Sequence, residues 1–206
     1  GRANKLAIPS ASKVCCNFPE TLKHLPEGKA VLSGSPIRAE LLNGSREKAL
    51  TFTGLDGSKP VLLIVGGSTG SKFINETVRR LLPNLMKTYD IIHLCGKGNI
   101  DPTLNHCDGY RQYEYISQEL PDLLSLAEIV ISRAGANAIC ELLALKKPNI
   151  LIPLSAAASR GDQILNAQSF EKQGFSYVLD EDTLTDAQLL TAVTTVAEKK
   201  NQYIEA

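Results

Sequence analysis

Residues 60–85 read PVLLIVGGSTGSKFINETVRRLLPNL, and this stretch decides the fold. Its first part, Val61–Val65, is a short apolar run rich in β-branched residues and bounded by Pro60 and Gly66. Such a run is typical of a strand buried on both faces of a sheet. After the turn, apolar residues recur at the spacing of one helical stripe, at Ile74, Val78, Leu81 and Leu85. The stretch therefore predicts a strand, a glycine-rich turn and a helix.

The same alternation continues to the end of the chain. We expect further strands at Ile91–Leu94, Tyr110–Ile116, Glu128–Ser132, Asn149–Ile152 and Phe175–Leu179. We expect helices at Leu120–Leu126, from the turn Arg133-Ala134-Gly135 through Leu145, at Asp162–Gln173, and after a capping box of Thr185 and Gln188. Strands that alternate with helices form a parallel sheet covered on both faces. The predicted fold class is α/β, a doubly wound, Rossmann-like parallel sheet.

Residues 1–36 lack this alternation, because prolines interrupt short apolar runs such as Lys13–Cys16 and Ala30–Leu32. We expect an irregular segment here, the remnant of an N-terminal domain and an interdomain linker, followed by a second domain at residues 37–206. The single methionine is Met86, which indicates that Gly1 is not a natural translation start. We interpret the chain as a fragment of a longer protein.

The composition of the chain disfavours several classes of function. The 22 basic and 22 acidic residues balance, so no overall field favours nucleic acid or an anionic membrane. No apolar run approaches the roughly 20 residues needed to cross a bilayer. The five cysteines are odd in number and show no metal-ligand spacing, which favours reduced thiols in a cytoplasmic protein.

Three loops at the ends of predicted strands are candidates for ligand binding, because parallel sheets bind ligands at the carboxyl ends of their strands. The first is Gly66–Ser71, whose glycines allow close backbone approach. It is not a Walker A loop, since Phe73 stands where Ser or Thr follows the lysine, and it does not match G-x-G-x-x-G. A tight structural turn is the alternative.

The second loop is Arg133–Glu141, which opens a predicted helix with small residues. Unpaired N–H groups and the helix dipole at such a start suit a diphosphate. Glu141, in the second turn, is placed to accept hydrogen bonds from ribose hydroxyls. A surface glutamate near a helix start is the alternative.

The third loop is Ser155–Gln163. Here Arg160 is a candidate for binding phosphate, and Gln163 is a candidate for binding hydroxyl groups. The alternatives are that Arg160 is simply solvated and that Gln163 caps the helix. Asp180-Glu181-Asp182 resembles a D-x-D metal motif, but its place before a capped helix favours a solvated loop. The three histidines, His24, His93 and His106, are isolated from one another in sequence and favour structural or surface roles.

These loops, in this order, resemble the C-terminal domain of the MurG-type peptidoglycan N-acetylglucosaminyltransferases, family 28 of the GT-B glycosyltransferases. The resemblance rests on motifs in register along nearly the whole chain: Asn4–Ala7 with Phe18-Pro19, Gly34–Arg38, Gly66–Ser68, Ser132–Glu141, and Pro153 through Asn166. Ser35 departs from the family's usual asparagine in the G-N-P-[VI]-R motif.

The resemblance assigns roles by position. It implies that Arg38 and Ser68 contact a UDP-sugar donor and that the backbone at Ile116 contacts the uracil. It further implies that Ala136, Asn137, Ala138 and Ile139 face the diphosphate, with Cys140 in the same signature. Glu141 would bind the ribose, and Gln163 the sugar hydroxyls.

The implied reaction moves N-acetylglucosamine from UDP-N-acetylglucosamine to an undecaprenyl-diphosphate-linked muramoyl-pentapeptide, with inversion and without a metal or other cofactor. The resemblance implies a peripheral location on the cytoplasmic face of the membrane for the full-length protein. The family's general base lies in its N-terminal domain, so we expect this fragment to bind donor without catalysing transfer. The alternatives are another GT-B transferase or epimerase, and a non-catalytic nucleotide-binding subunit of a split transferase.

Overall fold

The computed structural model describes residues 2–67, 69–158 and 161–206. The chain divides into two compact units, Gly1–Ile37 and Arg38–Ala206. Among the described residues, no helix combines the length and apolar character needed to cross a membrane.

The first unit is ordered, although an irregular segment was expected. It contains α1 (Arg2–Ala7), η1 (Ile8–Ser10), β1 (Val14–Cys16), η2 (Pro19–His24) and β2 (Ala30–Leu32). The two strands pair in parallel, with Val14 opposite Ala30 and Cys16 opposite Leu32. The expectation of irregular structure was wrong because strands of three residues are too short to show a period. Pro19 does not break the structure, since it begins η2 where no N–H donor is required.

The second unit is built on a six-stranded sheet in which every paired neighbour is parallel. The strands are β3 (Val61–Val65), β4 (Asp90–Leu94), β5 (Tyr110–Tyr113), β6 (Ala127–Ser132), β7 (Asn149–Leu151) and β8 (Tyr177–Val178). Their order is β5-β4-β3-β6-β7-β8. The predicted doubly wound parallel sheet is therefore confirmed.

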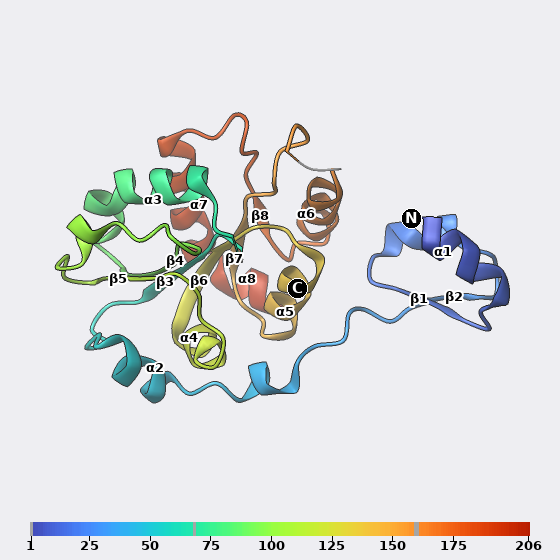
Figure 1. The fold of residues 1–206 in the computed structure, drawn as a ribbon, viewed down its shortest axis with the longest axis horizontal. Helices are drawn as coiled ribbons and strands as arrows, with labels where there is room; N and C mark the ends of the chain where they lie inside the picture. Colours follow the sequence, from blue (N-terminus) through green and yellow to red (C-terminus); the bar gives the residue numbers. More distant parts are fainter. Residues whose placement is uncertain (1, 68, 159–160) are drawn as a thin grey trace. The chain divides into compact units, whose positions relative to one another are not determined.

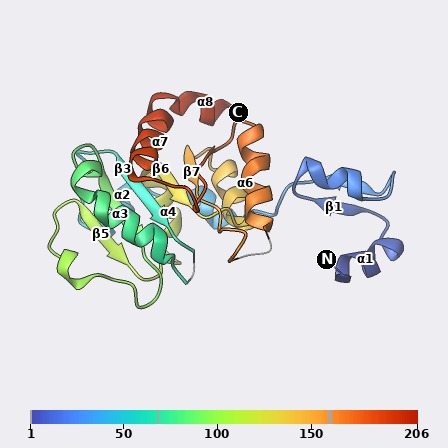
Figure 2. The same cartoon turned by 90° about the horizontal axis from the view of Figure 1, so that it is seen from above.

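Helices cover both faces of this sheet, with α3 and α7 on one side and α2, α4 and α5 on the other (Figures 1 and 2). The helical elements are η3 (Ala39–Asn43), α2 (Arg46–Thr53), α3 (Lys72–Leu85), η4 (Pro102–Leu104), α4 (Leu120–Leu126), α5 (Ala136–Ala144), α6 (Asp162–Lys172), α7 (Asp186–Glu198) and α8 (Lys200–Glu205). The predicted capping box of Thr185 and Gln188 is present at the start of α7.

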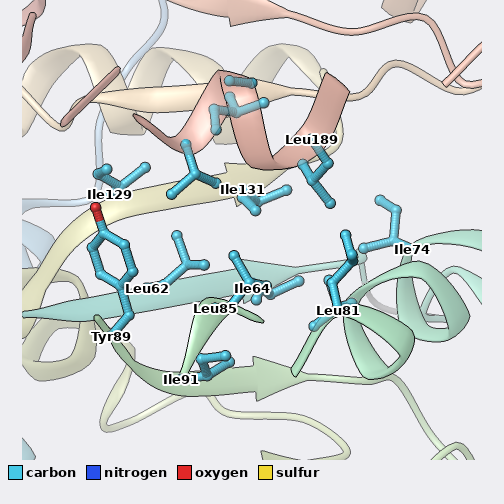
Figure 3. Close-up of a cluster of buried hydrophobic side chains, with 14 of the residues drawn as sticks. Leu62, Ile64, Ile74, Leu81, Leu85, Tyr89, Ile91, Ile129, Ile131 and Leu189 are labelled. Atoms are coloured by element: carbon cyan, nitrogen blue, oxygen red, sulfur yellow. The ribbon is translucent and has the colours of Figure 1, made fainter. Parts of the chain in front are cut away.

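The core on the first face joins the sheet to α3 and α7 (Figure 3). All four residues of the predicted helical stripe in α3 are no more than 4% exposed. Each such side chain contributes about 1.5–3 kcal/mol of burial free energy. This packing fixes α3 against β3 and so fixes the loop between them.

The strand order places a topological switch between β3 and β6. The chain leaves β3 toward one edge of the sheet, and it leaves β6 toward the other. Loops at a switch point diverge and leave a crevice at the carboxyl ends of the strands. The loops after β3 and β6, both candidates from the sequence, flank this point.

Candidate functional site

The start of α5 presents uncapped backbone N–H groups at the carboxyl end of β6. Gly135 is the N-cap residue with φ −65° and ψ 135°, and no side chain of the described residues caps the helix. The first intrahelical bond runs from the Ile139 N–H to the Gly135 carbonyl at 3.1 Å. The N–H groups of the preceding turn therefore have no acceptor within the helix, and they carry the positive end of its dipole. Such a start suits an anion.

The residues at the start of α5 that were predicted to bind the donor divide into two sets. Ala136 and Ala138 are partly exposed and Asn137 is exposed, so their backbone is accessible. Ile139 and Cys140 are 1% and 8% exposed. Their side chains pack on the core side of the helix, which makes them part of the support of the site rather than its surface.

Glu141, one turn further along α5, forms a bidentate ion pair with Arg38. The Arg38 Nε donates to Glu141 Oε1 at 2.9 Å and Nη2 donates to Oε2 at 3.2 Å. The Glu141 side chain is 17% exposed and that of Arg38 is 53% exposed. Because each carboxylate oxygen has two acceptor positions, Arg38 orients the carboxylate and still leaves it able to accept further hydrogen bonds.

The loop after β5 approaches the same ion pair. The hydrogen bond from Arg38 to Glu141 raises the pKa of Arg38, and the Tyr115 phenol acts in the same direction. Tyr115 is 67% exposed, and Ile116, the next residue, is partly buried. The predicted strand was too long here, since β5 ends at Tyr113 and Ile116 lies in the loop.

The glycine loop after β3 is closely packed at Gly70, whereas a Cβ at Gly67 would meet nothing within 4 Å. A side chain at Gly70, where φ is +76°, would meet the Cys95 carbonyl oxygen at 2.0 Å. Ser71 caps α3 by accepting the Ile74 N–H at 3.3 Å. Ser68, predicted to contact the donor, lies outside the described residues.

The loop after β7 is tied to the first turn of α6. The Leu154 N–H donates to the side-chain oxygen of Gln163 at 3.0 Å. In the next turn, Asn166 Nδ2 donates to the Ala134 carbonyl at 3.0 Å, which links α6 to the turn before α5. Arg160, the other candidate in this loop, lies outside the described residues.

Arg133 joins these loops, although its place in the Ser132–Glu141 motif predicted no such role. Its Nη2 donates to Ser71 Oγ and to Glu181 Oε1, each at 2.6 Å. Its Nη1 donates to the carbonyls of Ile152 at 3.1 Å and Pro153 at 3.3 Å. One guanidinium therefore connects the loops after β3, β6, β7 and β8.

The interpretation of residues 180–182 as a solvated loop is wrong for Glu181. Its side chain is 13% exposed and is paired with Arg133, whereas Asp180 and Asp182 are exposed. No sequence spacing connects the pair, because its partners are 48 residues apart. Within the described part of the chain, no group of three or more His, Cys, Asp or Glu residues is arranged to hold a metal ion.

A second buried polar network lies behind the glycine loop. His93 Nε2 donates to Asn75 Oδ1 at 3.0 Å, and the Tyr110 hydroxyl donates to His93 Nδ1 at 2.8 Å. The Asn75 amide orientation follows from its bond to the Cys95 carbonyl at 2.9 Å, which fixes this tautomer of His93. Burial, assisted by the nearby Arg79 charge, lowers the pKa of His93 to about 3. His93 is therefore neutral and structural, while His24 and His106 are exposed.

The sheet order, with the open start of α5 beside the switch point, defines a doubly wound α/β domain. The family described as glycosyltransferase family 28 C-terminal domain matches residues 61–206. The chain belongs to this family, and its second unit has the fold of the C-terminal half of a GT-B glycosyltransferase.

Similar proteins agree with this family. The chain is 64% identical over its whole length to a UDP-N-acetylglucosamine–N-acetylmuramyl-(pentapeptide) pyrophosphoryl-undecaprenol N-acetylglucosamine transferase of Lachnoclostridium phytofermentans. It is 58% identical, over 99% of its length, to the protein of that name from Lachnospira eligens. It spans 58% of the length of each relative. The crystal structure of Acinetobacter baumannii MurG matches 99% of the chain with a TM-score of 0.72 and 25% identity, and the match covers 56% of that structure.

Proposed function

We propose that this chain is the donor-binding part of an inverting glycosyltransferase. The transferase moves N-acetylglucosamine from UDP-N-acetylglucosamine to an undecaprenyl-diphosphate-linked muramoyl-pentapeptide in peptidoglycan synthesis. The observation that carries the proposal is the uncapped start of α5 with the Glu141 carboxylate one turn deeper, beside the switch between β3 and β6. The names of relatives 64% and 58% identical to the chain support it.

The proposed donor runs along the carboxyl edge of the sheet. The N–H groups of Ala136, Asn137 and Ala138 bind the pyrophosphate, and the Glu141 carboxylate accepts hydrogen bonds from the ribose hydroxyls. The backbone at Ile116 contacts the uracil. The remaining contacts are Arg38 and Ser68 to the donor and Gln163, through its amide Nε2, to the sugar hydroxyls.

This arrangement acts on the leaving group. As the bond between the sugar C1 and the phosphate oxygen breaks, negative charge grows on UDP. The preorganised N–H groups and the positive end of the α5 dipole stabilise this charge in the transition state. The general base and the lipid-linked acceptor belong to a part of the transferase beyond residues 37–206, and residues 1–36 are the end of that N-terminal domain with its linker.

The proposed location is the cytoplasmic face of the membrane, where the acceptor lipid lies. The balanced charge of the chain gives no reason to expect nucleic acid as a partner. We expect the chain alone to bind the donor and to release no UDP from it.

Calorimetry with UDP, UDP-N-acetylglucosamine and UDP-glucose tests the proposal. We expect Glu141→Ala to weaken all three ligands by about 1–3 kcal/mol, because each loses the charged acceptor for the ribose. The stability of the chain should change little, since Arg38 is half exposed and exposed ion pairs contribute about 0–1 kcal/mol.

Glu128→Ala is the matched control. Glu128 pairs with Lys200 at the amino end of β6, away from the carboxyl edge of the sheet, so its loss should leave the three affinities unchanged. Equal UDP affinity in wild type and Glu141→Ala would remove Glu141 from the site. Preference for UDP-glucose over UDP-N-acetylglucosamine would favour a different UDP-sugar transferase.

A further inference from the structure

The Arg133–Glu181 ion pair is the most enclosed of the described salt bridges. The two side chains are 11% and 13% exposed, whereas the Arg80–Asp186 pair, also at 2.6 Å, is 55% and 42% exposed. An enclosed ion pair gives little net stability, because desolvation offsets the attraction. The ion pair instead fixes the positions of the groups around it.

Glu181 uses its two oxygens on different loops. Oε1 accepts from Arg133, and Oε2 accepts the Ser155 backbone N–H at 3.1 Å. Arg133 also holds the carbonyls at the end of β7, just before this loop. Glu181 thereby anchors the loop after β7 to the base of the site.

The same loop carries the residue proposed to bind the sugar. The Leu154 N–H, adjacent to that of Ser155, holds the Gln163 side-chain oxygen. Two consecutive backbone N–H groups are thus fixed, one by Glu181 and one by Gln163. If Ser155 moves, Leu154 moves with it, and the Gln163 amide loses its orientation.

The start of α5 depends on other contacts. The turn before it is held by Asn166 Nδ2 on the Ala134 carbonyl and by the connection to β6. Among the described contacts, Glu181 reaches this turn through the Arg133 side chain. Loss of Glu181 should therefore disturb the loop after β7 more than the start of α5.

We infer that Glu181 is a positioning residue for the sugar end of the ligand. It acts through the Ser155 N–H and Gln163, and it leaves the pyrophosphate position at α5 largely unaffected. The inference rests on the proposed function, since it assigns the sugar to the Gln163 side of the site.

The test compares UDP with UDP-N-acetylglucosamine by calorimetry on the whole chain. Glu181→Gln should weaken UDP-N-acetylglucosamine roughly tenfold, as expected for a lost charged hydrogen bond, and change UDP less than about twofold. A merely structural role would weaken both ligands equally, so the ratio of the two affinities is the informative quantity.

Two further variants sharpen the test. Glu181→Asp keeps the charge for Arg133, but it is one methylene shorter and cannot bridge to Ser155, so it should show the same selective loss. Asp186→Asn removes the exposed arginine-paired carboxylate five positions later and should leave both affinities unchanged.

Amide hydrogen exchange keeps the inference testable without ligand. Exchange at Leu154 and Ser155 should be faster in Glu181→Gln than in wild type, while exchange at Ile139 in α5 should be unchanged. Unchanged exchange at Ser155, or an equal loss of both ligands, would overturn the inference. If wild type binds neither ligand although its amides respond as expected, the proposed function fails and the anchoring role of Glu181 stands.

Discussion

The helices α3 and α5 begin on either side of the switch point, each after a loop rich in small residues, and their first turns differ. At α3, Ser71 caps the helix and also receives a hydrogen bond from Arg133. At α5, the N-cap is Gly135, and in the part of the chain that the structure describes no side chain caps the helix. One helix start is closed by the protein itself, and the other is left open.

The glycines of the two loops show the same contrast. A Cβ at Gly70 would overlap the Cys95 carbonyl oxygen, whereas a Cβ at Gly135 would meet nothing within 4 Å. Gly70 is needed because two backbones approach closely, whereas neither the backbone angles nor the neighbouring atoms require a glycine at position 135. A glycine that is required by close packing, such as Gly70, therefore does not by itself indicate a ligand loop.

The largest expected effect is the loss of stability in Gly70→Ala. The substitution combines a positive φ of +76° with a 2.0 Å overlap with backbone, so the loop or β4 must shift. We expect a loss of more than about 3 kcal/mol in the free energy of unfolding, measured by urea titration.

Gly98→Ala is the control for Gly70→Ala. Gly98 has φ +73° with nothing within 4 Å of its Cβ, so only the backbone strain of about 1 kcal/mol is expected. Equal losses in the two variants would show that close packing does not hold the loop shut.

Much of the second unit could be predicted from the sequence. The strand β3, the helix α3 and the helix α4 follow from apolar runs and periodicity alone, because each buries a continuous face. The eight-residue α2 was missed since its start depends on a Ser45 cap and its position on packing against α4. A short helix of this kind is fixed by tertiary contacts rather than by its own pattern.

The candidate site was predictable as a set of loops, but its internal contacts were not. Arg38 and Glu141 were both proposed to bind the donor, yet they lie 103 residues apart and their ion pair could not be inferred. The ion pair between Arg133 and Glu181 could not be inferred either, because its partners are also far apart in the sequence. Motifs identify residues that share a function, whereas only the fold shows which of them hold one another.

A smaller effect is expected from pH acting on the network behind the closed loop. The pKa of His93 falls from 6.5 to about 3 on folding, so between these values the unfolded chain binds a proton that the folded chain does not. The contribution of neutral His93 to the free energy of unfolding is therefore fully present above pH 6.5 and is lost as the pH falls. The expected slope approaches about 1.4 kcal/mol per pH unit, well below pH 6.5.

Thermal or urea unfolding at pH 7, 6 and 5 measures this slope. His93→Gln should be less stable at pH 7 but should show a flatter pH dependence. His106→Gln, which removes an exposed histidine, should keep the wild-type slope. A wild-type slope in His93→Gln would mean that the pH dependence arises in another part of the chain.

The smallest effect on folding is expected at the open helix start. Gly135 has φ −65° and ψ 135°, a conformation that alanine adopts freely, and its Cβ would enter empty space. Gly135→Ala should change the free energy of unfolding by less than about 0.5 kcal/mol, because a poorer N-cap is offset by a less flexible unfolded chain.

Binding should respond where folding does not. The added methyl stands beside the N–H groups of Ala136–Ala138, so it should hinder one hydrogen bond to the pyrophosphate and weaken UDP by about 1 kcal/mol, or roughly fivefold. The two variants should then have opposite effects: Gly70→Ala loses stability, and Gly135→Ala loses affinity for UDP. A Gly135→Ala chain that binds UDP as tightly as wild type would show that the open turn is not where the ligand lies, because no described atom lies within 4 Å of the added methyl group.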